Sequence, residues 1–305
     1  INRINANIES TGNSAHERGM ASDRVAIGCY GMTHVGRQRT MNQDHFLIAD
    51  FKKHLSVEGA SFSCPDPQVF GDTMGKMMLV ADGMGGANAG EVASQLAISS
   101  LVQYLLNSMH WILRPSRQES ENLVSELKSA AQFAHSVLCK DVENEPDHRG
   151  MGTTLTVAYL VWPMLYVLHV GDSRCYLFRQ GRLQQLTDDQ TLAQTLLETG
   201  YLSREEFESS KYHNVLVSAI GVEGGPQTLI YSRRLKPGDK LMLCSDGVTA
   251  HLKDEDIAQW MQSSKTPEEA CQGMIDLANE RGGRDNSTAI VVNCFQVDEE
   301  KGLPG

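Results

Sequence analysis

The residues of this sequence best suited to chemistry are five aspartates that stand beside apolar runs, namely Asp44, Asp82, Asp172, Asp246 and Asp285. Two of them directly precede a glycine, in the pairs Asp82-Gly83 and Asp246-Gly247. An Asp-Gly pair alone is a common turn, but five carboxylates that each abut a hydrophobic run indicate a shared role. Hard divalent cations require oxygen ligands, and glycine allows backbone carbonyl groups to approach an ion. The pattern therefore predicts a site for Mg²⁺ or Mn²⁺, since both suit oxygen ligands.

Two divalent cations in such a cluster would suit the hydrolysis of a phosphate monoester. Ions about 3.5–4 Å apart offset the repulsion between phosphate and hydroxide, lower the pKa of a bridging water and align it for in-line attack. Other phosphate chemistry has no support. No Cys is followed six positions later by Arg, and the motifs G-x-x-x-x-G-K-[ST], H-E-x-x-H and G-x-S-x-G are missing from the sequence. We therefore expect direct attack by a metal-bridging hydroxide, without a phosphoenzyme.

The charge balance restricts the partners. Lys and Arg total 27 against 38 Asp and Glu, for a formal net charge of -11. Nucleic acids and anionic membrane surfaces require an excess of cations, so both are disfavoured. Bound divalent cations would offset part of the acidity, which makes it compatible with a phosphoprotein substrate. No apolar run approaches the roughly 18 residues of a membrane-spanning helix. The seven scattered cysteines, odd in number, predict reduced thiols and a cytoplasmic protein.

Hydrophobic periodicity indicates the elements that must position the aspartates. We expect strands at 25–30, 45–51, 76–81, 153–161, 165–170, 174–179, 240–244 and 287–295. Apolar residues at steps of three and four predict helices at 90–107, 119–142, 254–262 and 267–281. Residues 52–75, rich in Gly and Pro, are interpreted as a long loop or a hairpin insertion. The strands cluster and two long helices separate them in one block, so the fold class is α+β rather than a β-α-β repeat.

Six short segments in a fixed order make the sequence recognisable: RTMNQD at 39–44, VADGMGG at 80–86, GTT at 152–154, HVGDSR at 169–174, CSDG at 244–247 and RDNST at 284–288. Together they resemble the metal-dependent protein phosphatases of type 2C, in their bacterial-like form. The resemblance implies a four-layer α-β-β-α sandwich, with two central, mainly antiparallel sheets flanked by helices. It implies a catalytic domain at 24–298 with a variable flap at about 192–222. Residues 1–23 and 299–305 are expected to be flexible tails.

The resemblance also implies which residues hold the ions. Asp82 would bridge two core Mg²⁺ or Mn²⁺ ions. The backbone carbonyl of Gly83 would bind one of them, and Asp246 and Asp285 would hold the other. Asp172 would form a third, weaker site with Asp246.

Two further residues are expected to act on the substrate. Asp44 would act through metal-bound water. Arg39 would bind the phosphate, for which a planar guanidinium is better suited than an ammonium group. Arg37 is a nearby competitor, and the family spacing favours Arg39.

Three positions depart from the family pattern. Met84 stands where some relatives have a His that serves as the acid for the leaving alcohol, so metal-bound water or Asp44 must supply that proton. Ala250 stands where many relatives have another Asp, which removes one ligand from the third metal site. Gln43 replaces a Glu found in some relatives, so one water-mediated contact to the metal site is weaker.

Other polar and aromatic residues near the motifs are interpreted as structural. His169 is expected to be a packed core residue, and Thr153 and Thr154 are expected to support the start of a strand. For the flap aromatics Tyr201, Phe207 and Tyr212, packing of the flap onto the core is favoured over contact with substrate.

The predicted function is hydrolysis of phosphoserine and phosphothreonine in proteins. The expected partners are a phosphorylated protein substrate and a serine/threonine kinase that acts on it, and the protein is expected to be a monomer. Two alternatives remain: a catalytically weak relative that acts as a regulatory or scaffolding module, and a phosphatase for small phosphate esters. Catalytically silent relatives usually lose metal-binding aspartates, whereas Asp82, Asp246 and Asp285 are all present.

Overall fold

Two antiparallel β-sheets form the centre of the molecule. The structure, a computed structural model, describes residues 25–56, 68–86, 89–108 and 117–296. One sheet has the strand order β1 (Val25–His34), β11 (Ser287–Gln296), β10 (Lys240–Cys244), β7 (Arg174–Arg179) and β8 (Arg182–Gln185). The other has the order β2 (Asp44–Ser56), β3 (Gln68–Met84), β5 (Leu155–Val161), β6 (Met164–Val170) and β9 (Leu229–Arg234), and β4 (Gly152–Thr153) pairs with β3.

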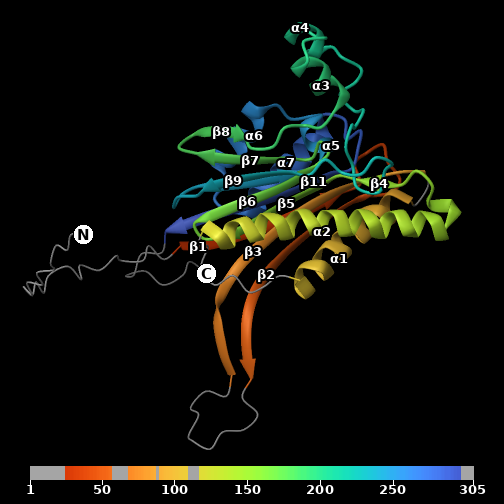
Figure 1. The fold of residues 1–305 in the computed structure, drawn as a ribbon. Coiled ribbons are helices and arrows are strands. Elements are labelled where there is room, and N and C mark those ends of the chain that lie inside the picture. Colours follow the sequence, from red (N-terminus) through yellow and green to blue (C-terminus); the bar gives the residue numbers. More distant parts are fainter. Residues whose placement is uncertain (1–24, 57–67, 87–88, 109–116, 297–305) are drawn as a thin grey trace, which may run out of the picture.

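Helices cover the outer face of each sheet (Figure 1). The long helices α1 (Ala89–Ser108) and α2 (Arg117–Asn144) pack on the sheet that contains β3, through residues such as Leu101 and Leu127. On the other sheet lie α6 (Asp254–Ser263) and α7 (Pro267–Glu280), with Met274 buried against β7, β10 and β11. The four layers expected from the sequence are therefore confirmed.

The middle of strand β3 has no polar face, because both of its faces are buried. Its residues 77–81 are fully buried. Met77 and Leu79 belong to the core beneath α1 and α2, whereas Met78 and Val80 belong to the core between the sheets. Successive side chains of a strand point to opposite faces, so a strand buried on both faces reads as a continuous apolar run.

Most predicted elements are present, but some bounds differ and some short elements were not predicted. Strand β1 extends to His34, and residues 52–75 include the paired ends of a β2–β3 hairpin, which agrees with the hairpin alternative predicted there. Strand β9 and the short helix α5 (Asp246–Thr249) were not predicted. Strand β9 is mostly exposed, so it lacks the apolar run that marks the buried strands. The predicted tails at 1–23 and 299–305 lie outside the described residues.

Two short helices, α3 (Leu192–Glu198) and α4 (Arg204–Glu208), project from the sandwich above the sheet edge (Figure 1). Thr191 caps α3 by accepting a hydrogen bond from the Gln194 N–H. Ser203 and Glu206 form a reciprocal capping box at the start of α4, which satisfies N–H groups that a helix of this length leaves unpaired. Tyr201, between the two helices, is 79% exposed, so its predicted packing against the core is wrong.

No helix in the described ranges combines the length and the apolar character that crossing a membrane requires.

Candidate metal centre

The register of the sheets brings four of the predicted aspartates to one cavity. Asp44 and Asp82 are directly paired across β2 and β3. Asp246 lies two residues beyond the end of β10, and Asp285 lies two residues before β11, which pairs with β10. A cavity of about 660 Å³ is lined by Asp82, Asp246 and Asp285 together with Asp172, which follows β6. Both sheets thus contribute carboxylates from the same edge of the sandwich.

Two glycines permit this convergence because backbone segments approach them too closely for a side chain. A Cβ on Gly83 would run into the carbonyl oxygen of Gly90 at the start of α1, and one on Gly247 would run into the carbonyl of Asn286. The Gly83 N–H also donates to the Gln43 carbonyl at 3.1 Å. The glycine after each aspartate is therefore required by close packing between elements.

Asp44 joins the two sheets below the cavity. Its side chain is 2% exposed, and Oδ2 accepts hydrogen bonds from Ser245 Oγ at 2.6 Å and Thr288 Oγ1 at 2.7 Å. Its Oδ1 atom is buried and has no hydrogen-bond partner. Burial raises the pKa of Asp44 to about 7, although the two hydroxyl donors oppose the shift. An unpaired buried carboxylate oxygen is costly, so this atom is available to a further donor.

The carboxylates around the cavity repel one another. Burial, and then the charges of Asp44 and Asp246, raise the pKa of Asp82 well above its ordinary value. Burial and the charge of Asp246 raise the pKa of Asp172 to about 8, and burial followed by the charge of Asp285 raises the pKa of Asp246. All three shifts have the same physical origin, because an apolar surrounding and like charges both disfavour the ionised form.

Two arginines stand beside these aspartates, and both are already paired. Arg39 Nη2 donates to Asp285 Oδ2 at 2.7 Å, with the Arg39 side chain 53% exposed at the mouth of the cavity. Arg174 is held by Asp189, with Nη2 at 2.6 Å from Oδ2 and Nε at 2.9 Å from Oδ1. The competing Arg37 does not line the cavity. The buried carboxylates therefore outnumber the cations near them.

The side chains present fit divalent cations in their chemistry. The acidic side chains that line the cavity offer oxygen atoms only, and Asp44, paired with Asp82 across β2 and β3, has a buried Oδ1 without a partner. Within the described ranges, no three side chains of His, Cys, Asp or Glu are arranged to hold an ion as they stand. A bound cation would offset the mutual repulsion of these aspartates.

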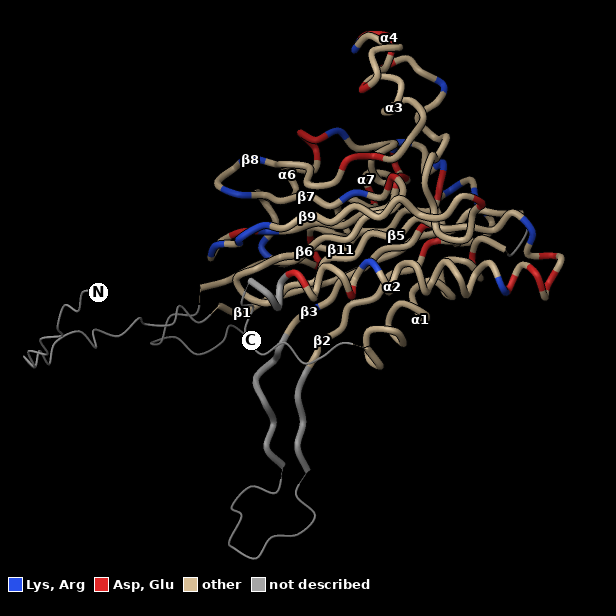
Figure 2. Tube along the Cα trace, in the orientation of Figure 1, with Lys and Arg blue, Asp and Glu red and all other residues tan. Residues whose placement is uncertain are grey.

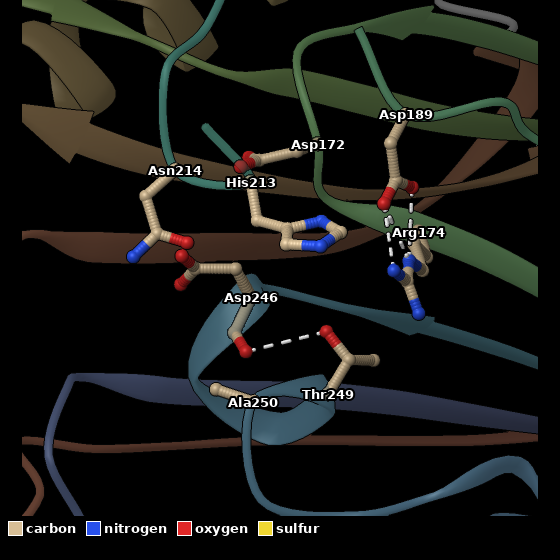
Figure 3. Close-up of a pocket in the computed structure, with 8 residues that line it drawn as sticks. All are labelled: Asp172, Arg174, Asp189, His213, Asn214, Asp246, Thr249 and Ala250. Atoms are coloured by element: carbon tan, nitrogen blue, oxygen red, sulfur yellow. Dashed lines mark hydrogen bonds and ion pairs between the residues drawn. The ribbon is translucent and has the colours of Figure 1, made fainter. Parts of the chain in front are cut away.

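A smaller pocket of about 190 Å³ adjoins this cavity, and Asp172 and Asp246 line both (Figure 3). Three of its lining residues lie outside the sequence motifs and were not predicted, namely Asp189, His213 and Asn214. His213 Nε2 donates to the Phe207 carbonyl at 2.6 Å, and the two rings meet edge to face at 4.5 Å. These residues lie on connecting segments, where neither periodicity nor spacing marks them.

Ala250 lines the same pocket, at the position where many relatives of the type 2C family have an Asp. It contributes no ligand atom there. The carboxylates that line the pocket are those of Asp172, Asp246 and Asp189, and Asp189 is already paired with Arg174.

Thr153, Thr154 and His169 have the structural roles expected of them. Thr154 Oγ1 accepts from the Asp82 N–H at 3.0 Å, and Thr153 Oγ1 donates to the Asp82 carbonyl at 2.9 Å. His169 is fully buried, with Nε2 donating to the Asp188 carbonyl at 3.0 Å. Burial lowers the pKa of His169 to about 4, so it is a neutral core residue.

Comparison with known proteins agrees with this geometry. The family described as "Protein phosphatase 2C" matches residues 63–279. The serine/threonine phosphatase stp of Listeria monocytogenes is 35% identical over 79% of this chain and 90% of its own length. The serine/threonine protein phosphatase PstP of Mycobacterium tuberculosis is 36% identical over 73% of this chain, but the match spans only 41% of that relative's length.

Solved structures show the same arrangement of the chain. The structure of the M. tuberculosis phosphatase PstP/Ppp covers 88% of this chain and 99% of its own, at a TM-score of 0.70 and 31% identity. A PstP catalytic domain in complex with two manganese ions covers 89% of this chain, at a TM-score of 0.69 and 30% identity. The chain belongs to the protein phosphatase 2C family.

Proposed function

We propose that this protein is a Mg²⁺- or Mn²⁺-dependent protein serine/threonine phosphatase, with its catalytic domain at residues 24–298 and a flap at about 192–222. The observation that carries the proposal is the cluster of buried carboxylates. These carboxylates come from both sheets and outnumber the basic side chains beside them. The relatives named above are serine/threonine phosphatases, and one of their catalytic domains is described with two manganese ions.

In this proposal Asp82 would contact both core ions. The backbone carbonyl of Gly83 would help to hold one of them, and Asp246 and Asp285 would help to hold the other. Asp172 and Asp246 form a third, weaker site, which lacks a ligand because Ala250 lines the pocket there. When bound, the ions supply charge neutralisation and an activated water nucleophile for in-line attack on phosphorus.

Arg39 binds the substrate phosphate. Its guanidinium is at the mouth of the cavity, within hydrogen-bond distance of Asp285. The planar fork of N–H donors on Arg39 suits two phosphate oxygens. Arg39 thereby orients the ester for attack.

Asp44 Oδ1 is the proposed proton carrier. Ser245 and Thr288 fix Oδ2, and Oδ1 is left without a partner. A carboxyl oxygen that lacks a partner in this way can accept and return a proton. Met84 cannot serve, because a thioether carries no proton.

A metal-dependent assay tests this function. The protein should hydrolyse phosphothreonine peptides with Mn²⁺, lose that activity with EDTA, and prefer the peptides over a panel of small phosphate esters. Asp246→Asn serves as the inactive control. Activity confined to the small esters would favour a small-ester phosphatase, and Mn²⁺ binding without any turnover would favour a scaffolding module.

We further propose that the protein acts as a monomer in the cytoplasm and reverses the action of a serine/threonine kinase. The six cysteines in the described part of the chain are unpaired, as the reducing cytoplasm favours. Light scattering of the purified protein tests the monomer. Phosphoproteome comparison of cells with and without the active protein tests the pairing with a kinase.

A further inference from the structure

One wall of the carboxylate cavity is apolar and exposed. Val215 and Val217, on the segment that follows α4, line the cavity and remain 44% and 42% exposed. Both belong to the few large hydrophobic side chains in the described part of the chain that are exposed to this degree. Exposed apolar groups beside polar catalytic groups mark binding surfaces.

The backbone of this wall is fixed relative to the aspartates. The Val217 N–H donates to the Gln190 carbonyl at 2.9 Å, and the Val215 carbonyl accepts from the Leu192 N–H at 2.7 Å. Gln190 in turn exchanges two hydrogen bonds with Gly171, the residue before Asp172: its N–H donates to the Gly171 carbonyl, and its Oε1 accepts from the Gly171 N–H, both at 2.8 Å. The valines are thus tied to the strand end that carries a predicted ligand.

Further apolar side chains line the same cavity. Met84 and Val222 both contribute to its surface. A Cβ placed on Gly152 would lie 2.7 Å from Met84 Cε and 2.9 Å from Val222 Cγ1, so the two side chains converge over that glycine. The cavity therefore combines carboxylates with apolar side chains, of which Met84 belongs to β3 and Val215, Leu216, Val217, Ala219 and Val222 belong to the flap segment.

We propose that Val215, Val217, Met84 and Val222 form an apolar subsite that selects substrates with a large aliphatic residue next to the phosphorylated serine or threonine. The subsite is continuous with the proposed phosphate site, so a bound phosphopeptide must place its neighbouring side chains against it. Burial of an aliphatic side chain on this surface stabilises the complex by removing apolar area from water. The inference rests on the proposed phosphatase function.

Two phosphothreonine peptides that differ only in the residues flanking the phosphothreonine test the subsite. One peptide carries Leu on both sides and the other carries Ser. We expect kcat/KM of the wild-type protein to favour the Leu peptide about tenfold, from the partial burial of each flanking side chain. In the variant Val215→Thr/Val217→Thr, which keeps the shape of the side chains but adds hydroxyl groups, the ratio should fall toward one.

Tyr201→Ser is the matched control, because Tyr201 is exposed on the flap and does not line the cavity. It should keep the wild-type ratio. Equal kcat/KM for the two peptides in the wild-type protein, or an unchanged ratio in the double threonine variant, would overturn the subsite alone. Absence of turnover of both peptides, with Mn²⁺ bound, would overturn the phosphatase function and the subsite together. Thermal melting of each variant verifies that it is folded.

Discussion

Buried carboxylates are paired with a cation at one end of the β7–β10 pair and lie close to one another at the other end. At the far end, Asp239 is 2% exposed and fully bonded, since its carboxylate accepts from Arg179 Nε at 2.8 Å, from Arg179 Nη2 at 2.6 Å and from the Lys236 N–H at 2.7 Å. At the other end, Asp246 lies near Asp82, Asp172 and Asp285. Burial and repulsion raise the pKa values of Asp246, Asp82 and Asp172.

The difference separates a structural carboxylate from functional ones. The basic side chains are distributed in the same way. Figure 2 shows Lys and Arg at the ends of β7, β8 and β9 that are remote from the cavity, where Arg179, Arg182, Arg233 and Arg234 lie. A charge that only stabilises a fold is paired at once, because an unpaired buried charge is expensive. The protein retains carboxylates without cationic partners at the cavity. This arrangement is favourable only if cations from solution bind there and neutralise their charge.

The largest effect expected from breaking this contrast is on catalysis. Asp82→Asn should lower kcat by roughly 10⁴-fold or more, since it removes the ligand proposed to bridge the ions. The same change should leave the melting temperature of the metal-free protein unchanged or higher, because it removes one repelling charge. Steady-state kinetics with Mn²⁺ and calorimetry with EDTA measure the two effects. Near-normal kcat would exclude the bridging role.

Removal of the metal should destabilise the folded protein, and more so at higher pH. Free Mn²⁺ at 100 times Kd adds about 2.7 kcal/mol per site to the free energy of unfolding. Without metal, the pKa values of Asp44 and Asp172 are about 7 and 8, above the ordinary 3.8. The folded protein then binds more protons than the unfolded chain, so stability falls as pH rises toward 8.

Urea titrations at several pH values, with EDTA or Mn²⁺, test this linkage. With Mn²⁺ the pH dependence near neutrality should flatten, because the ions hold the carboxylates ionised. A metal-free protein whose stability rises between pH 6 and 8 would contradict the proposed repulsion at this edge.

At the far end the same type of substitution should affect stability instead of turnover. Asp239→Asn leaves the Arg179 guanidinium, 31% exposed, without its buried partner. We expect a loss of about 2–3 kcal/mol in the free energy of unfolding, at the lower end of values for buried pairs because Arg179 reaches solvent. The kcat of the folded variant should match that of the wild-type protein. A large fall in kcat without a loss of stability would refute the contrast between the ends.

The smallest effect expected concerns a buried histidine at the site end. His169 has a pKa of about 4 in the folded protein against an ordinary 6.5. The unfolded chain therefore binds more protons between these values, and the contribution of a neutral His169 is lost as pH falls below 6.5. The loss amounts to about 2 kcal/mol at pH 5. The pH dependence of unfolding should be weaker in His169→Gln by that amount, and an equal dependence in both proteins would contradict the assignment.

The predicted elements and the observed ones agree best where burial imposes a pattern. The helix predicted at 90–107 is Ala89–Ser108, and the strand predicted at 240–244 is Lys240–Cys244. Strand β9, with the sequence LIYSRR, was missed because an exposed edge strand needs no apolar alternation. The periodicity of a sequence reports contact with a core, so elements without such contact leave a weak signal.

The candidate site divides in the same way. The five aspartates were predicted from their positions at the ends of apolar runs. Asp189, His213 and Asn214 were not, since they reach the pocket only because the flap segment returns to the sheet edge. The pairing of Arg39 with Asp285 joins residues 246 positions apart, and neither residue indicates the other in the sequence.

The sequence by itself determined which residues carry the charge, where the buried strands run, and that five carboxylates stand beside them. The tertiary structure alone decided that four of these carboxylates line one cavity and that one oxygen of the fifth, Asp44, has no partner. It also decided that two valines of the flap segment lie beside them. The reason is physical: strand periodicity is a local property of the chain, whereas repulsion, burial and cavity shape depend on segments that only the packing of two sheets brings together.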